Sequence, residues 1–109
     1  MKVKSKIWLE KNGELVIGEG KSRLLKVINQ TGSINKAAKK MGVSFRHAWG
    51  CLTAIEKRLG VKLIERSRGG RGGGGSILTP AAKRLIRKYD KLRDSVITFT
   101  DAAYKRISS

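Results

Sequence analysis

The sequence predicts a mainly helical fold with two small β-hairpins, and three observations support this prediction. Residues 33–59 have the pattern of two short helices joined by a tight turn. A basic, glycine-rich loop spans residues 66–76 and stands between two β-type stretches. A long stripe of apolar residues at helical spacing then fills residues 80–109. In this order the elements form a winged helix-turn-helix with an N-terminal β-hairpin and a long C-terminal helix.

Residues 6–18 predict the N-terminal hairpin. Two apolar, β-prone runs flank Asn12-Gly13, a dipeptide that accepts the positive φ angles of a type I′ turn. We expect Trp8 to pack against the domain rather than to form a platform on which bases stack.

Three helices are expected next. The apolar spacing becomes helical from about Gly20 and ends at Thr31-Gly32, where the glycine favours a helix C-cap. Ser33 is expected to cap a second helix at residues 34–41, whose small residues allow a neighbouring helix to cross closely. Ser44 is expected to cap a third helix that runs to about Leu59.

The third helix has two different faces. One face is apolar and is formed by Ala48, Cys51, Leu52, Ile55 and Leu59. The other face carries no acid and little bulk, which favours reading of base edges in the major groove by Ser44, Arg46, Gly50, Thr53 and Lys57. Phe45 and Trp49 flank the apolar face, and we expect them to complete the core rather than to touch thymine methyl groups or sugars.

The remaining residues of the third helix predict no catalytic or metal site. His47 is the only histidine and Cys51 the only cysteine of the chain. We expect His47 to contact solvent or phosphate, because metal ligation needs partner ligands that the sequence does not offer. Cys51 is expected to be a small core residue. The scattered acids offer no catalytic pair, so no enzymatic activity, cofactor or metal is expected.

The glycine-rich loop is interpreted as a wing over residues 61–79. Its arginines are predicted to lie along phosphates or in the minor groove, and Lys36 in the second helix is predicted to contact phosphate. A slack connector is the alternative. A P-loop is disfavoured because no Gly-Lys-Ser/Thr leads into a helix. The predicted wing contacts are Arg66, Arg68 and Arg71.

Thr79-Pro80 has the residues of a helix start, with Thr as cap and Pro at the first helical position. Apolar residues recur from Ala82 to Ala103 at spacings of three or four. The first half of this helix is expected to pack partly on its own domain, and the second half to be covered by the same helix of a second copy. The predicted dimerisation residues are Leu85, Tyr89, Leu92, Val96, Phe99 and Ala103.

Charge predicts the class of partner. The chain has 25 Lys and Arg against 8 Asp and Glu, a formal net charge of +17 on 109 residues, and this charge lies on patterned, foldable sequence. A polyanion is therefore the expected partner. No signal peptide or membrane span is evident, so we expect a cytoplasmic protein without a membrane partner.

Residues 32–79 resemble the DNA-binding domain of LysR-type regulators and, more closely, that of ModE-type molybdate-responsive repressors. The similarity rests on residues 31–44, on residues 59–66, on the wing at residues 69–79 and on the pair Ala48-Trp49. With the flanking hairpin and long helix, it spans about residues 5 to 107. It implies a homodimer joined through antiparallel long helices, with recognition helices in successive major grooves of a palindromic operator. In that family molybdate binds domains that follow the long helix, so no molybdate site is expected in this chain.

We therefore expect residues 1–79 to form a DNA-binding domain, with the helix-turn-helix at about 33–59, and residues 80–109 to form a dimerisation helix. The expected function is sequence-specific binding of double-stranded DNA in transcription regulation. An architectural, nucleoid-type DNA-binding protein is the alternative that the high charge favours. A protein-interaction module using the terminal helix is a further alternative.

Overall fold

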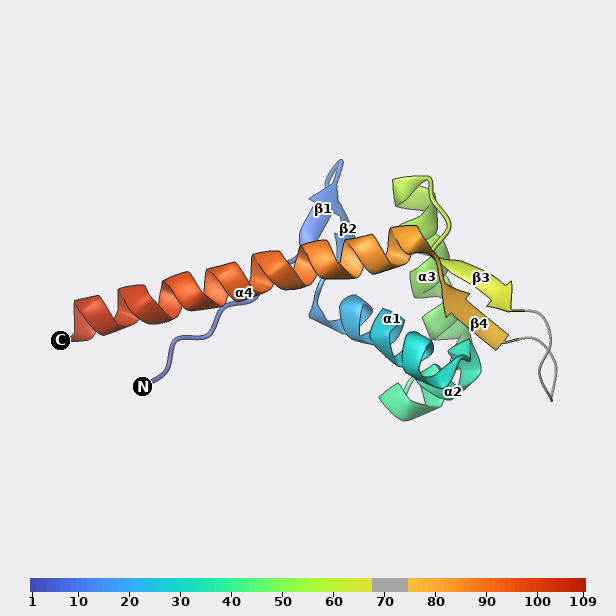
Figure 1. Cartoon of the computed structure of the whole chain (residues 1–109), viewed down its shortest axis with the longest axis horizontal. Coiled ribbons are helices and arrows are strands. Elements are labelled where there is room, and N and C mark those ends of the chain that lie inside the picture. The colour runs from blue at the N-terminus through green and yellow to red at the C-terminus, as the bar shows by residue number, and fades with distance from the viewer. Residues whose placement is uncertain (68–74) are drawn as a thin grey trace.

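The computed structural model describes residues 1–67 and 75–109. Within the described residues, three short helices and two hairpins form a domain from which one long helix extends (Figure 1). The molecule measures 58 × 29 × 23 Å along its principal axes. The elements in chain order are β1 (Leu9–Lys11), β2 (Glu14–Ile17), α1 (Glu19–Thr31), α2 (Ile34–Met41), α3 (Phe45–Leu59), β3 (Ile64–Ser67), β4 (Gly75–Leu78) and α4 (Pro80–Ser108).

The N-terminal hairpin forms as predicted. Strands β1 and β2 pair antiparallel around Asn12 and Gly13, whose φ angles of 53° and 79° are those that a type I′ turn requires. Trp8 packs less completely than expected, because 50% of its surface is exposed. Its indole N–H donates a hydrogen bond to Glu10 Oε2 at 2.8 Å.

Each predicted cap is present. The side-chain oxygens of Ser33, Ser44 and Thr79 accept hydrogen bonds from the backbone N–H groups of the third residue beyond them, at 3.0–3.1 Å. Gly32 ends α1 in the left-handed conformation, with its N–H donated to the Ile28 carbonyl. These local signals fix where the helices begin and end, which is why the sequence located them.

The core lies where α1, α2, α3 and the start of α4 meet. The apolar stripes of α1 and α2 are buried, and α3 buries Ala48, Leu52 and Ile55, while Cys51 and Leu59 pack partly against the same cluster. Each small hairpin closes onto this core. The Ser76 N–H donates to the Gly32 carbonyl at 2.7 Å, which ties β4 to the corner between α1 and α2.

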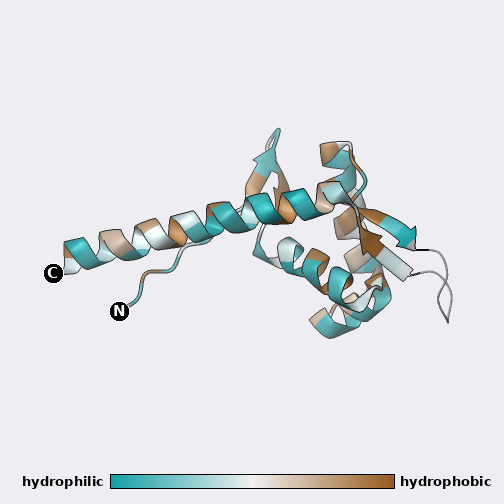
Figure 2. Ribbon diagram, viewed as in Figure 1, coloured by the Kyte–Doolittle hydropathy of each residue, from teal (hydrophilic) through white to brown (hydrophobic). Residues whose placement is uncertain are grey.

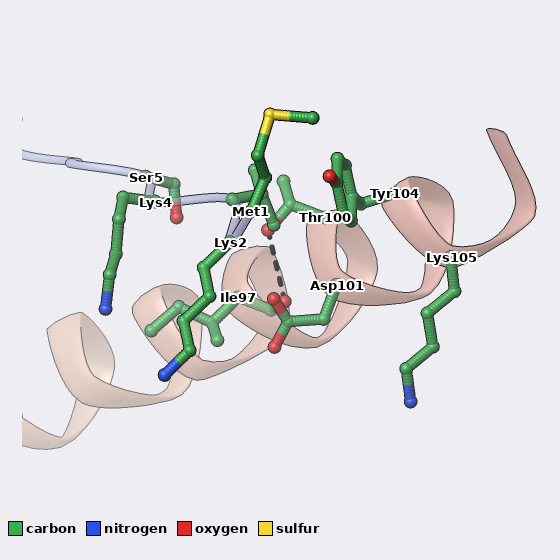
Figure 3. A pocket seen from close by; sticks show the side chains of 10 residues that line it. Met1, Lys2, Lys4, Ser5, Ile97, Thr100, Asp101, Tyr104 and Lys105 are labelled. Carbon is green, nitrogen blue, oxygen red and sulfur yellow. Dashed lines mark hydrogen bonds between the residues drawn. The ribbon is translucent and has the colours of Figure 1, made fainter. Parts of the chain in front are cut away.

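The long helix α4 has two unlike halves. Its first half packs on the domain through Ala82 and Tyr89, while Leu85 is partly buried against the core. The second half runs away from the domain, on the side opposite the β3–β4 hairpin (Figure 1). Figure 2 shows hydrophobic bands recurring along it between hydrophilic ones. Residues 1–5 run beside this second half, near Ile97, Thr100 and Tyr104 (Figure 3).

The prediction that Tyr89 belongs to the dimer surface is therefore wrong. Its side chain is 1% exposed, and its hydroxyl lies 3.1 Å from the Ile7 carbonyl oxygen and 3.3 Å from Glu19 Oε2. Burial, together with the negative charge of Glu19, raises the pKa of this hydroxyl above its usual range. Tyr89 belongs to the core of its own protomer, because α1 and the N-terminal segment already cover it.

Candidate nucleic-acid interface

Helices α2 and α3 and the turn between them form a helix-turn-helix, with the β3–β4 hairpin beside it (Figure 1). The buried face of α3 holds it against the core, so its other face is turned to solvent. That outer face contains the residues predicted for the major groove. Ser44, Arg46, Gly50 and Lys57 are exposed and Thr53 is half-buried.

Two of these residues also make contacts within the protein. Ser44 Oγ accepts the His47 backbone N–H at 3.0 Å, so Ser44 caps α3. Thr53 Oγ1 donates to the Gly50 carbonyl at 3.2 Å, which occupies its hydroxyl proton. Both oxygens keep further hydrogen-bonding capacity for a partner.

Gly50 has no structural need to be glycine. A Cβ built at this position meets nothing within 4 Å, and the residue lies in the middle of α3. Glycine inside a helix costs about 0.5–1 kcal/mol relative to alanine. The missing side chain therefore leaves open space on the exposed face of α3, and it brings no packing benefit to the protein itself.

The prediction that Phe45 and Trp49 complete the core is wrong. Their side chains are 49% and 50% exposed, and their rings stack with centroids 6.2 Å apart and an angle of 13° between the planes. The core beneath α3 is already filled by Ala48, Leu52 and Ile55, so these two large rings remain outside it. Sequence periodicity placed them beside the apolar stripe but gave no measure of the space available there.

The β3–β4 hairpin has the position and pairing of the predicted wing. Its strands pair antiparallel from Ile64 with Leu78 to Ser67 with Gly75. Arg66 is exposed on β3, whereas Arg68 and Arg71 lie outside the described residues. A groove of about 740 Å³ separates this hairpin from α3, and the start of α2 lines its third side. Lys36 is exposed near that start.

The charges of this face differ from those of the opposite side. Among residues 1–67 and 75–109, the cations that form ion pairs are Lys26, Arg58 and Arg93. None of them belongs to the predicted interface. Two acids do lie near the groove: Glu65 is exposed, and Glu56 accepts the Leu63 backbone N–H at 2.8 Å.

His47 is exposed and Cys51 is half-buried beside it one turn along α3, with Nε2 and Sγ 3.7 Å apart. Within the described part of the chain, no group of three or more His, Cys, Asp or Glu side chains is arranged to hold a metal ion. No described helix is both long and apolar enough to cross a membrane.

Comparison with known proteins identifies the family. Residues 21–83 match the model of bacterial regulatory helix-turn-helix proteins of the lysR family. The chain belongs to this family. The match begins within α1 and ends within α4, and it includes α2, α3 and the β3–β4 hairpin, the elements that build the interface described above.

The chain is also similar to several named regulators. It is 49% identical over 78 residues to the transcriptional regulator ModE of Haemophilus influenzae, covering 72% of this chain and 31% of that protein. It is 44% identical over 69 residues to the DNA-binding transcriptional dual regulator ModE of Escherichia coli K12, covering 63% and 26%. The chain thus spans about a third or less of these relatives, which are regulators rather than enzymes.

Solved structures share the fold. A CbnR DNA-binding domain in complex with DNA superimposes with a TM-score of 0.60 at 23% identity, covering 81% of this chain and 95% of that one. A BenM DNA-binding domain on benA site 1 DNA gives a TM-score of 0.56 at 26% identity, covering 83% and 94%. The predicted winged helix-turn-helix architecture is confirmed.

Proposed function

We propose that this chain binds double-stranded DNA sequence-specifically and regulates transcription as a homodimer on a palindromic operator. The observation that carries the proposal is the outer face of α3. Arg46 and Lys57 extend from it without an internal ion pair in the described part of the chain, and Gly50 leaves open space between them. A helix with one buried face, one such exposed face and a neighbouring wing fits the major groove of B-DNA.

In this proposal, side chains around α3 hold the phosphate backbone. Arg66 lines the groove between α3 and the wing, Lys36 follows directly after the α2 residues that line it, and both are exposed. Contacts of this kind position a protein on the duplex without reading sequence. Arg68 and Arg71, which the structure does not describe, are proposed for the same role. The family membership and the DNA-bound structural neighbours support DNA as the partner.

The dimer is proposed to form through the second half of α4. Leu92 is 43% exposed and Phe99 67% exposed, and Val96 and Ala103 lie on the same side of the helix. A second copy of this stripe covers these residues by two-fold symmetry. Tyr89 contributes to the protomer's own core instead, whereas Leu85 is only partly buried against that core and is proposed to contribute its exposed part to the dimer.

The test combines selection of DNA with a pair of glycine substitutions. The full chain selects duplexes from a random-sequence pool, and binding to the enriched duplex is measured with competitor DNA present. A defined footprint is expected; equal binding to all duplexes indicates the architectural alternative, which the charge of +17 favours. A chain that ignores DNA but binds another protein indicates an interaction module.

Gly50→Leu is expected to keep or raise the melting temperature, because leucine is the better helix former, while reducing affinity for the enriched duplex at least tenfold. Gly20→Leu is the matched control, since Gly20 is also helical with open space at its Cβ. Equal affinities of the two variants would remove the outer face of α3 from the interface.

A further inference from the structure

Phe45 and Trp49 form a flat apolar surface that the protein itself does not use. They stand one turn apart on α3, stack at 6.2 Å, and leave about half of each side chain in contact with water. Exposed aromatic rings of this size lose the free energy that burial provides, so their position indicates a partner that covers them.

The surroundings of the pair indicate what that partner is. Both rings line the groove of about 740 Å³ between α3 and the wing, together with Arg66 and Ser76. Lys62 lines the same groove, and the chain as a whole carries a charge of +17. Glu56 and Glu65 are the acids there, and Glu56 is held by the Leu63 backbone N–H. The two cations and two acids of the groove balance, but the chain as a whole is strongly basic, so this apolar surface is complementary to nucleic acid rather than to another basic chain.

The position of Phe45 and Trp49 on α3 indicates which part of the nucleic acid they contact. Trp49 immediately precedes Gly50, whose Cβ position is empty, so the residue after Trp49 has no side chain that could obstruct a base edge approaching the indole. In the major groove the thymine C5-methyl is the apolar group on a base edge, and apolar side chains recognise it by contact.

We propose that Phe45 and Trp49 contact thymine methyl groups in the major groove of the DNA. The thymines concerned belong to the DNA strand that lies against the protein groove between α3 and the wing. This inference rests on the proposed DNA-binding function and assigns it two specificity-determining residues. The two rings lie nearly parallel, with 13° between their planes, so together they present one continuous apolar surface to a base step. The polar side chains of α3 read hydrogen-bonding groups on the neighbouring bases.

The test replaces thymine by deoxyuracil in the duplex enriched by the full chain, one position at a time. Each replacement deletes one methyl group and leaves the hydrogen-bonding edge of the base unchanged. At one or two positions per half-site we expect the unaltered chain to lose about fourfold in affinity, the value that corresponds to one buried methyl group. Trp49→Ala and Phe45→Ala are expected to bind thymine and deoxyuracil duplexes equally at the position that each residue reads.

Trp8→Ala is the control, because Trp8 is exposed to the same extent and does not line the groove. This variant is expected to discriminate thymine from deoxyuracil as the unaltered chain does. Trp49→Gln provides a second variant with a straight-chain helix former if Trp49→Ala does not fold.

Two results overturn the inference while leaving the proposed function intact: the unaltered chain binds specifically but does not distinguish thymine from deoxyuracil at any position, or the Phe45 and Trp49 variants discriminate as well as the unaltered chain. Failure of the unaltered chain to enrich any duplex contradicts the proposed function itself and the inference with it.

Discussion

The two sides of this small domain use their charged residues differently. Where α1 meets α4, Lys26 bonds Asp90 at 2.9 Å, and Arg93 lies 3.4 Å from both Glu19 and Asp90 and 5.8 Å from the centre of the Tyr89 ring. On α2, α3 and the wing, the exposed cations proposed for DNA make no such pair within the described part of the chain.

The difference separates residues that support folding from residues available to a partner. Charges at the α1–α4 contact already have their partners, so they add little attraction for DNA. Charges and rings on the α3 side gain their partners on binding. Substitutions on the first side are expected to change stability, and those on the second to change affinity.

The largest expected loss of DNA affinity comes from substitutions in the second half of α4, which belongs to neither of these two sides. Changing Leu92 and Phe99 together to Lys is expected to convert a dimer into a monomer and to weaken operator binding by about 10²–10⁴-fold, because the second half-site loses its high effective concentration. Sedimentation of both chains and melting of the variant check this. A monomeric unaltered chain at micromolar concentration with full operator affinity contradicts the dimer.

Arg46→Ala tests the affinity side directly. It is expected to cost about 1–3 kcal/mol at the cognate site, with a smaller loss on random duplex, because a base contact is specific to sequence. Titration of both duplexes measures the difference. Arg84→Ala is the control, an exposed arginine on α4. Equal losses on cognate and random DNA show that Arg46 contacts phosphate only.

The wing is expected to act on all sequences alike. Replacing Arg68 and Arg71 by Ala is predicted to lower the slope of log affinity against log salt by about 1 per lost phosphate contact. Binding measured at several salt concentrations on cognate and random duplex gives the slope. Replacing Arg84 and Lys88, exposed on α4, supplies a control with the same change in charge. An unchanged slope in the wing variant indicates that the loop is a connector.

The smallest expected effect tests the folding side. Tyr89→Phe removes the hydroxyl that meets Ile7 and Glu19, and is expected to cost about 0.5–1.5 kcal/mol of unfolding free energy with DNA affinity unchanged. The pKa of Tyr89 is raised in the folded state, so its contribution is complete below the unfolded pKa of about 10 and is lost as pH rises through the folded value. Denaturant unfolding of both chains between pH 8 and 11, as approximate limits around that pKa, is expected to show the steeper decline in the unaltered chain.

The sequence by itself determined the elements of this protein and most of the candidate site. Ser33, Ser44 and Thr79 marked helix starts, and Asn12-Gly13 marked the hairpin turn, because caps and tight turns depend on residues a few positions apart. The outer face of α3 followed from helical periodicity, which assigns Arg46, Gly50 and Lys57 to one side without knowledge of the core.

Only the tertiary structure decided which apolar residues are covered. Tyr89 and Phe99 belong to the same apolar pattern, yet one is 1% exposed and the other 67%. Ile7 and α1 cover Tyr89, whereas residues 1–5 run beside Ile97, Thr100 and Tyr104 on the second half of α4 and leave Phe99 exposed. Phe45 and Trp49 lie outside the core because Ala48, Leu52 and Ile55 already fill the space beneath α3. Burial depends on neighbours brought together from distant parts of the chain, and periodicity within one helix carries no information about them.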